Sequence, residues 1–96
     1  MYIVLNKHAP ALMLCVDRKW RSVTPIEFIL TYKTARWARA MAQRCGGVVA
    51  HVPRDHTLDA SGTVWPPYDN VRGRPLSAYV RLADNAGLTY ETNLLR

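Results

Sequence analysis

The chain has 96 residues, with 13 Lys or Arg against 7 Asp or Glu, and its formal net charge is +6. This length is typical of one domain and excludes a large enzyme of several lobes, so we expect a single domain over residues 1–96. Hydrophobic residues make up 49% of the chain and charged residues 21%, which is enough apolar surface to fold and excludes a disordered basic tail.

Two short apolar runs near the N-terminus predict a β-hairpin. Residues 2–5 and 12–16 are rich in strand-forming side chains, and residues 6–10 between them have the composition of a turn, so the hairpin loop is longer than two residues. A charged turn follows over residues 17–21. Trp20 lies among three cations in this turn and is a candidate anchor for a partner.

The segment after this turn allows two interpretations. Residues 24–27 have the sequence of a capping-box helix start, whereas residues 27–32 are rich in β-branched and aromatic side chains. One continuous helix through this segment and the next would place Phe28 on the same side as Arg36, so the two phases conflict. We therefore break the chain near Lys33 and predict a strand over residues 27–32.

The segment from Thr34 to Cys45 is the clearest helix of the sequence. Thr34 is a suitable N-cap, four alanines give high helix propensity, and Gly46 ends the helix. On the helical wheel, the side expected to face the sheet contains Trp37, Ala38, Met41, Ala42 and Cys45. The opposite side contains Arg36, Arg39 and Gln43, with Lys33 and Arg44 on its flank.

The second half of the chain contains weaker patterns. Residues 47–52 predict a strand, and residues 63–65 predict a short edge strand within the loop-rich segment 53–75. Residues 75–87 have an apolar helical stripe with Pro at the start and Gly at the end, and the tail 88–96 either adds a strand or frays. The predicted fold class is α+β: a small antiparallel sheet packed on one Ala-rich helix, with a second C-terminal helix.

The positive charge is concentrated in one half of the sequence. Residues 1–48 contain eight Lys or Arg against two Asp or Glu, whereas residues 49–96 contain five of each. A one-sided basic field favours an anionic partner, either nucleic acid or an acidic protein surface. Ten of the thirteen cations are Arg, which suits bidentate contacts with phosphate or carboxylate; a coding bias toward Arg codons is the alternative explanation.

The sequence lacks the motifs of catalysis and of metal binding, so we expect neither an enzyme nor a cofactor. His51 and His56 match no zinc spacing. No activated nucleophile is indicated, and the glycine pair 46–47 ends a helix, whereas a phosphate site would begin one. The sequence does not show whether the acidic residues of segment 53–70 lie close together in the fold. A small hydrolase or nuclease that uses them is therefore a third hypothesis.

The run Arg72-Gly73-Arg74-Pro75 resembles the centre of an AT-hook, which lays Arg-Gly-Arg along the minor groove of A·T-rich DNA. The resemblance covers these four residues alone. Asn70-Val71 stand where that family has proline and basic residues, and the following residues lead into the predicted second helix. A turn before a helix that starts with proline is the interpretation we favour.

The N-terminal residues have neither the basic start nor the long apolar run of a signal peptide, and no segment is long enough to cross a bilayer. We therefore expect a cytoplasmic protein without a membrane partner. Cys15 and Cys45 are expected to be buried, free thiols, and their mutual distance stays open.

The candidate partner-binding surface combines cations of the predicted helix with those of the turn before it: Arg18, Lys19, Trp20, Arg21, Lys33, Arg36, Arg39 and Arg44. Arginines beside an accessible aromatic ring suit an acidic protein groove, and they equally suit backbone phosphates or stacked bases. A solvated helix face without a partner is the alternative.

The chain from Tyr2 to Val52 runs from a short hairpin through a charged Trp20 turn and Tyr32-Lys33-Thr34 to an alanine-spaced helix and a strand. This order resembles that of small sheet-plus-helix accessory proteins of phages and mobile elements, which include anti-CRISPR proteins and other inhibitors of host machinery. The resemblance implies a non-enzymatic inhibitor in the host cytoplasm. Many such inhibitors are acidic mimics of nucleic acid, whereas this chain is basic. An acidic protein surface therefore fits better as its partner, with a nucleic-acid-binding regulator as the alternative.

Overall fold

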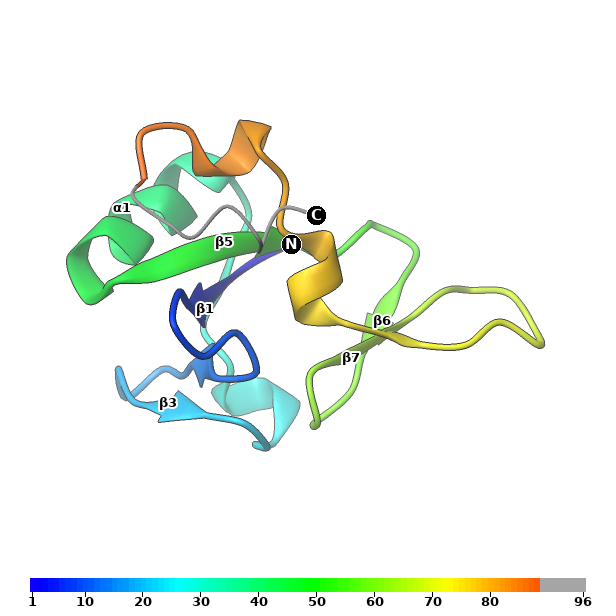
Figure 1. The fold of residues 1–96 in the computed structure, drawn as a ribbon. Coiled ribbons are helices and arrows are strands. Elements are labelled where there is room, and N and C mark those ends of the chain that lie inside the picture. The colour runs from blue at the N-terminus through cyan, green and yellow to red at the C-terminus, as the bar shows by residue number, and fades with distance from the viewer. Residues whose placement is uncertain (89–96) are drawn as a thin grey trace.

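The strand β1, Tyr2–Asn6, lies at the centre of the larger sheet in the computed structural model, which describes residues 1–88. Along one edge it pairs with β5, Gly47–His51, over its whole length. Its other edge is shared by β4 and β2, and β3 extends the sheet beyond β2, all in antiparallel pairs (Figure 1). These three strands have two residues each: β2 Met13–Leu14, β3 Trp20–Arg21 and β4 Thr31–Tyr32. The β1–β2 pairing confirms the predicted hairpin and its long loop.

The helix α1, Ala35–Cys45, confirms the clearest sequence prediction. It ends at Gly46, which has the left-handed φ of 72° that glycine adopts without strain. Thr34 is the N-cap residue, but its side chain makes no capping hydrogen bond. Ala38 and Ala42 are completely buried against the sheet, because their methyl groups let the helix backbone approach it closely.

Both faces of β1 are covered, because successive side chains of a strand point to opposite faces. Val4 and its neighbour Val49 on β5 lie on the face that packs against α1. Ile3 and Leu5 lie on the other face, in a second cluster with side chains from the later part of the chain. The sheet is therefore the middle layer of the domain, and the observed class is α+β, as predicted.

A three-stranded antiparallel sheet contributes to the second cluster through Leu58 and Val64. Its strands are β6 Thr57–Leu58, β7 Thr63–Trp65 and β8 Arg74–Pro75. The prediction of a strand over residues 63–65 is confirmed, but its expected place at an edge is wrong. β7 is the middle strand, because Val64 pairs with Leu58 on one side and with Arg74 on the other.

The strand predicted over residues 27–32 is confirmed only at its end, in β4. Residues Ile26–Phe28 form a 3₁₀ turn, η1, in which the N–H of Phe28 donates to the carbonyl oxygen of Pro25. Proline presets the φ of such a turn, and this local preference outweighs the β-forming side chains that follow. The predicted break near Lys33 is confirmed, since α1 begins at Ala35.

The second helix predicted over residues 75–87 is wrong. This segment contains two 3₁₀ turns, η2 Leu76–Tyr79 and η3 Ala83–Asn85. Between them Val80 is extended and forms a bridge with Ala50 of β5, which a continuous helix would not allow. The apolar stripe of this segment reflects burial of Leu76 and Val80 against the sheet.

Cys15 and Cys45 are both free thiols, as predicted. Cys15 is buried, and Cys45 is half-buried at the end of α1. The prediction for the tail covers residues 88–96. Of these, Leu88 packs against the cluster beneath α1, and residues 89–96 lie outside the described part of the chain.

Candidate basic binding surface

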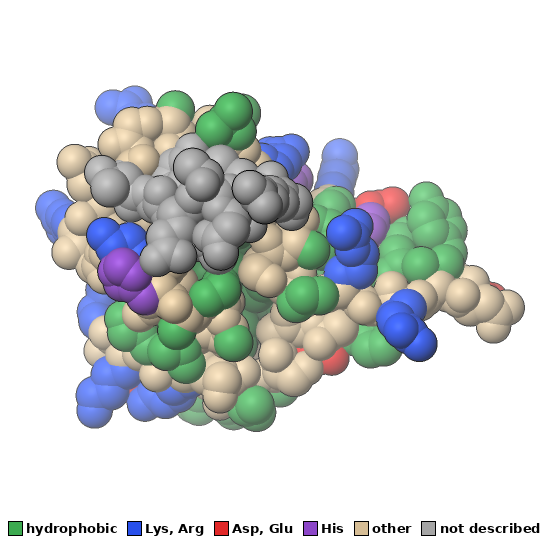
Figure 2. Space-filling model, in the orientation of Figure 1, with side chains coloured by type: hydrophobic (Ala, Val, Ile, Leu, Met, Phe, Trp, Pro, Cys, Tyr) green, Lys and Arg blue, Asp and Glu red, His purple; other side chains and the backbone are tan. Residues whose placement is uncertain are grey.

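Seven cations predicted to bind a partner lie in the turn before β3, on β3, and along α1 and the residues leading into it. In Figure 2, Lys and Arg side chains gather along the left of the molecule, over the part that contains α1 and β3 in Figure 1. Most of these side chains are exposed, while Arg21 and Arg39 are half-buried. We call this set the basic surface: Arg18, Lys19, Arg21, Lys33, Arg36, Arg39 and Arg44.

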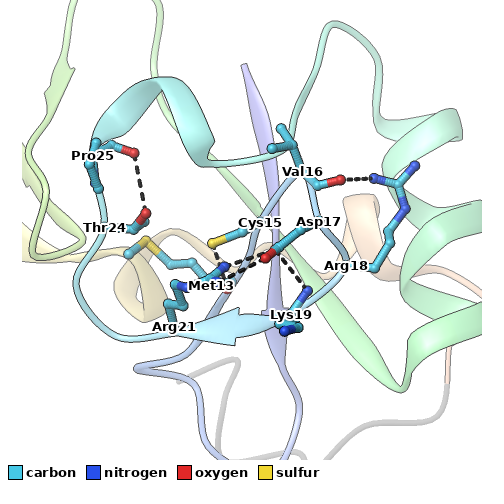
Figure 3. A network of polar contacts seen from close by, with 9 residues as sticks. All are labelled: Met13, Cys15, Val16, Asp17, Arg18, Lys19, Arg21, Thr24 and Pro25. Carbon is cyan, nitrogen blue, oxygen red and sulfur yellow. Dashed lines mark hydrogen bonds and ion pairs between the residues drawn. The ribbon is translucent and has the colours of Figure 1, made fainter.

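The turn at residues 17–21 is held together by the carboxylate of Asp17 (Figure 3). Arg21 donates to both oxygens of Asp17 at 2.8 Å, and the backbone N–H of Lys19 donates to the same carboxylate at 3.2 Å. The guanidinium of Arg21 lowers the pKa of Asp17 to about 2, so Asp17 is ionised at neutral pH. Arg21 is thus already paired with Asp17. The net positive charge of the basic surface comes from its other cations.

Arg18 has a left-handed backbone, with φ of 67°, which turns its side chain away from Asp17. Its Nη1 donates to the carbonyl oxygen of Val16 at 3.0 Å (Figure 3). Burial raises the pKa of Tyr32, and the positive charges of Arg18 and Arg44 act on the same phenol in the opposite direction. The structure therefore brings the turn and the end of α1 together around Tyr32.

Trp20, the predicted anchor, is half-buried and packs against the cluster beneath α1, with the far end of its ring beside Gly47. The aromatic ring that the basic surface exposes is Trp37, which is 62% exposed. The expectation that Trp37 faces the sheet is wrong. A tryptophan is too large for the close contact that Ala38 and Ala42 make, so the helix turns it outward.

A hollow of about 150 Å³ lies beside Trp37, where α1 meets β4, and is lined by Tyr32, Trp37, Ala40, Met41 and Arg44. Four of these five residues present apolar surface, and the fifth is a cation. The guanidinium of Arg36 lies 5.8 Å from the centroid of the Trp37 ring, a cation–π distance. An exposed aromatic ring, a small apolar hollow and several arginines therefore occupy one helix face. One sequence feature could have indicated this arrangement: Trp37 is much larger than Ala38 and Ala42, with which it was expected to share the side facing the sheet.

Several of the groups considered for catalysis or metal binding are engaged in structural contacts. The ring of His51 lies against that of Tyr2, with centroids 4.6 Å apart and planes tilted by 45°, and the Nδ1 of His56 lies 2.9 Å from Oδ1 of Asp55. Burial raises the pKa of the Cys45 thiol, which donates to the backbone of α1. Within residues 1–88 no three His, Cys, Asp or Glu side chains form a group that could hold a metal ion.

Searches of protein-family models, curated proteins and solved structures found no match to this chain. Among the helices of residues 1–88, none has the length and apolar character needed to cross a membrane. The functional argument therefore rests on the basic surface itself.

Proposed function

We propose that this protein is a non-enzymatic binding module that contacts an acidic surface of another protein through its basic surface. The observation that carries the proposal is Trp37, a large aromatic side chain that is 62% exposed among cations. Together with the apolar hollow beside it, this ring forms an exposed apolar patch with a polar rim, which is typical of interaction sites. Trp and Arg are also the residue types that most often dominate the binding energy of protein interfaces.

The hollow beside Trp37 favours a protein as the partner. Its apolar lining from Ala40 and Met41 accepts an aliphatic or aromatic side chain, while Arg36 and Arg44 at its margin suit carboxylates. The bidentate Asp17–Arg21 pair is an intramolecular example of the contact that we expect between free arginines and the partner. A partner segment with one apolar side chain flanked by acidic residues fits this combination.

A module of this kind would act as an inhibitor if the acidic surface that it covers is a functional site. This is the role implied by the resemblance to accessory proteins of phages and mobile elements, and it requires no catalytic group. The second candidate function is a nucleic-acid-binding regulator. It is favoured by the same exposed Trp37, because a base can stack on an indole while neighbouring arginines contact phosphates.

The test compares three variants with the wild type in chemical cross-linking and affinity capture from host extract, followed by titration of each captured protein. Arg36→Glu reverses one charge of the basic surface, Trp37→Ala removes the anchor, and Arg54→Glu is the control with the same charge change elsewhere. We expect Trp37→Ala to weaken binding by about 2 kcal/mol, or about thirtyfold, with a comparable loss for Arg36→Glu and no change for the control. Unchanged binding by both surface variants would refute the proposal.

A titration with duplex and single-stranded oligonucleotides separates the two candidate functions. A nucleic-acid binder loses affinity linearly in the logarithm of salt concentration, with a slope of about −0.7 to −0.9 per neutralised phosphate. Such a slope, together with weaker binding by Trp37→Ala, would replace the protein-partner proposal with the regulator. Absence of oligonucleotide binding at low salt would remove the regulator from consideration.

A further inference from the structure

A second exposed apolar region lies on the other half of the chain, outside the basic surface. Residues 66–73 connect β7 to β8 and project from the body of the molecule toward the right of Figure 1. We call residues 65–74 the arm. Its large side chains are open to solvent, with Trp65 exposed by 44%, Tyr68 by 66% and Val71 by 46%.

The base of the arm is fixed by specific contacts. The indole N–H of Trp65 donates to Asp59 at 2.9 Å, and the same carboxylate accepts hydrogen bonds from Ser61 and Thr63. Gly73 lies directly against the Trp65 ring, where an added Cβ would be 2.8 Å from the ring carbon Cδ2. The base of the arm is therefore ordered before any partner arrives, which lowers the entropy lost when its loop binds.

The arm contains three charged side chains. Two of them, in the loop that connects its strands, have opposite signs, whereas the third, Arg74 at its base, lies over the ring of Tyr79. Asp69 and Arg72 lie on either side of residues 70–71, both are exposed, and neither forms an ion pair with any residue of the described part of the chain. If two arms meet about a two-fold axis that passes between residues 70 and 71, Asp69 of each copy lies beside Arg72 of the other. A two-fold contact requires this kind of self-complementary surface.

We propose that the arm is a self-association surface through which two copies of this chain pair about a two-fold axis. The alternative of pairing through the basic surface brings together like charges, and the whole chain carries +6. In an arm-to-arm pair the two basic surfaces lie at opposite ends. Each chain is 37 Å long, so they are separated by well over the Debye length of about 8 Å at physiological ionic strength.

The contact uses side chains of the arm and not the backbone of its edge strand. β8 contains Pro75, which has no N–H to donate, and a proline on an edge strand opposes pairing with another strand. Tyr68, Val71 and the charge pair are then the groups that bury surface. A pair of this form displays two basic surfaces, which raises the avidity for a partner with repeated acidic sites. This inference goes beyond the proposed function and does not depend on it.

The test measures mass in solution by sedimentation equilibrium from about 10 µM to about 1 mM protein. For the wild type we expect the mass to rise from the 10.9 kDa of one chain toward twice that value. Asp69→Arg and Arg72→Asp each create like-charge contacts across the axis and should weaken pairing by at least about tenfold. An equimolar mixture of these two variants restores both opposite-charge pairs and should pair again.

Matched controls change the same charges elsewhere. Glu27→Arg and Arg54→Asp lie on exposed positions outside the arm and should pair as the wild type does. Tyr68→Ser removes an exposed ring with no role in the fold and should also weaken pairing, with an unchanged circular dichroism spectrum. A mass that stays at 10.9 kDa over the whole range would overturn the proposal, and so would a mixture that fails to pair.

Discussion

Asn85 closes the free edge of β5, and its replacement tests how that edge is stabilised. Its side chain is completely buried. The backbone N–H of Val49 donates to the side-chain oxygen of Asn85 at 2.6 Å, and the side-chain nitrogen donates to the carbonyl oxygens of Val49 at 3.0 Å and Arg81 at 2.7 Å. One amide side chain thus substitutes for a neighbouring strand. We predict that Asn85→Ala is strongly destabilising.

The magnitude follows from the groups left without a partner. Asn85→Ala leaves the N–H and the carbonyl oxygen of Val49 buried and unpaired, whereas the more exposed carbonyl of Arg81 gains access to water. Each of these two unpaired buried groups costs about 1–3 kcal/mol, so we expect a loss of about 2–6 kcal/mol in the free energy of unfolding. For a domain of this size each kcal/mol lost lowers Tm by about 4–8 °C, so the fall should be at least about 8 °C.

Urea-induced unfolding, followed by far-ultraviolet circular dichroism, measures this loss. Leu82→Ala is the matched control, because Leu82 immediately precedes η3 but is 68% exposed and should cost less than about 0.5 kcal/mol. Asn85→Asp tests the direction in which stability changes with pH. Its new oxygen faces carbonyl oxygens, which raises the pKa of the carboxyl, so destabilisation should grow as pH rises above about 4. A loss below about 1 kcal/mol for Asn85→Ala would refute the reasoning.

Further expected outcomes concern the first residue of β5, the base of the arm and the last residue of β5. Gly47→Ala should cost about 1–3 kcal/mol in urea unfolding, because a Cβ would lie 2.8 Å from the carbonyl oxygen of Leu5. Hydrogen bonds from Ser61 and Trp65 lower the pKa of Asp59 from 3.8 to about 2, so the stabilisation by its carboxylate is present above pH 3.8 and is lost toward pH 2. The NMR signal of the Trp65 indole N–H should shift over this pH range as the hydrogen bond to Asp59 is lost. Asp59→Asn should abolish this shift. Burial lowers the pKa of His51 from 6.5, so thermal stability should fall as pH drops below 6.5, and His51→Phe should reduce that fall.

The elements that local sequence determines were predictable. Alanine spacing and a terminal glycine identify α1, and the apolar runs of β1 and β5 identify strands, because both faces of these strands are buried. The second half of the chain was harder. The stripe of residues 75–87 is apolar for a tertiary reason, namely contact with the sheet, and the bridge between Val80 and Ala50 overrides the helical period.

The candidate surface was predictable in its charge but not in its aromatic anchor. The cations of α1 fall on the outer side because nothing in the core can neutralise them. Whether Trp20 or Trp37 is the exposed anchor depends on the distance between the helix and the sheet, which a helical wheel does not show. Ala38 and Ala42 close that gap and exclude Trp37, while Trp20 fills space beside Gly47.

Because β1 is buried on both faces by different parts of the chain, the two faces are covered at different times during synthesis. The five strands of the larger sheet and α1 all lie within residues 2–51, so this part is available for folding as soon as it leaves the ribosome. The cluster that buries Ile3 and Leu5 is completed by later residues, between Leu58 and Val80. A nascent chain from which residues 2–51 have emerged, but not yet residues 58–80, therefore exposes an apolar surface on which other chains can aggregate.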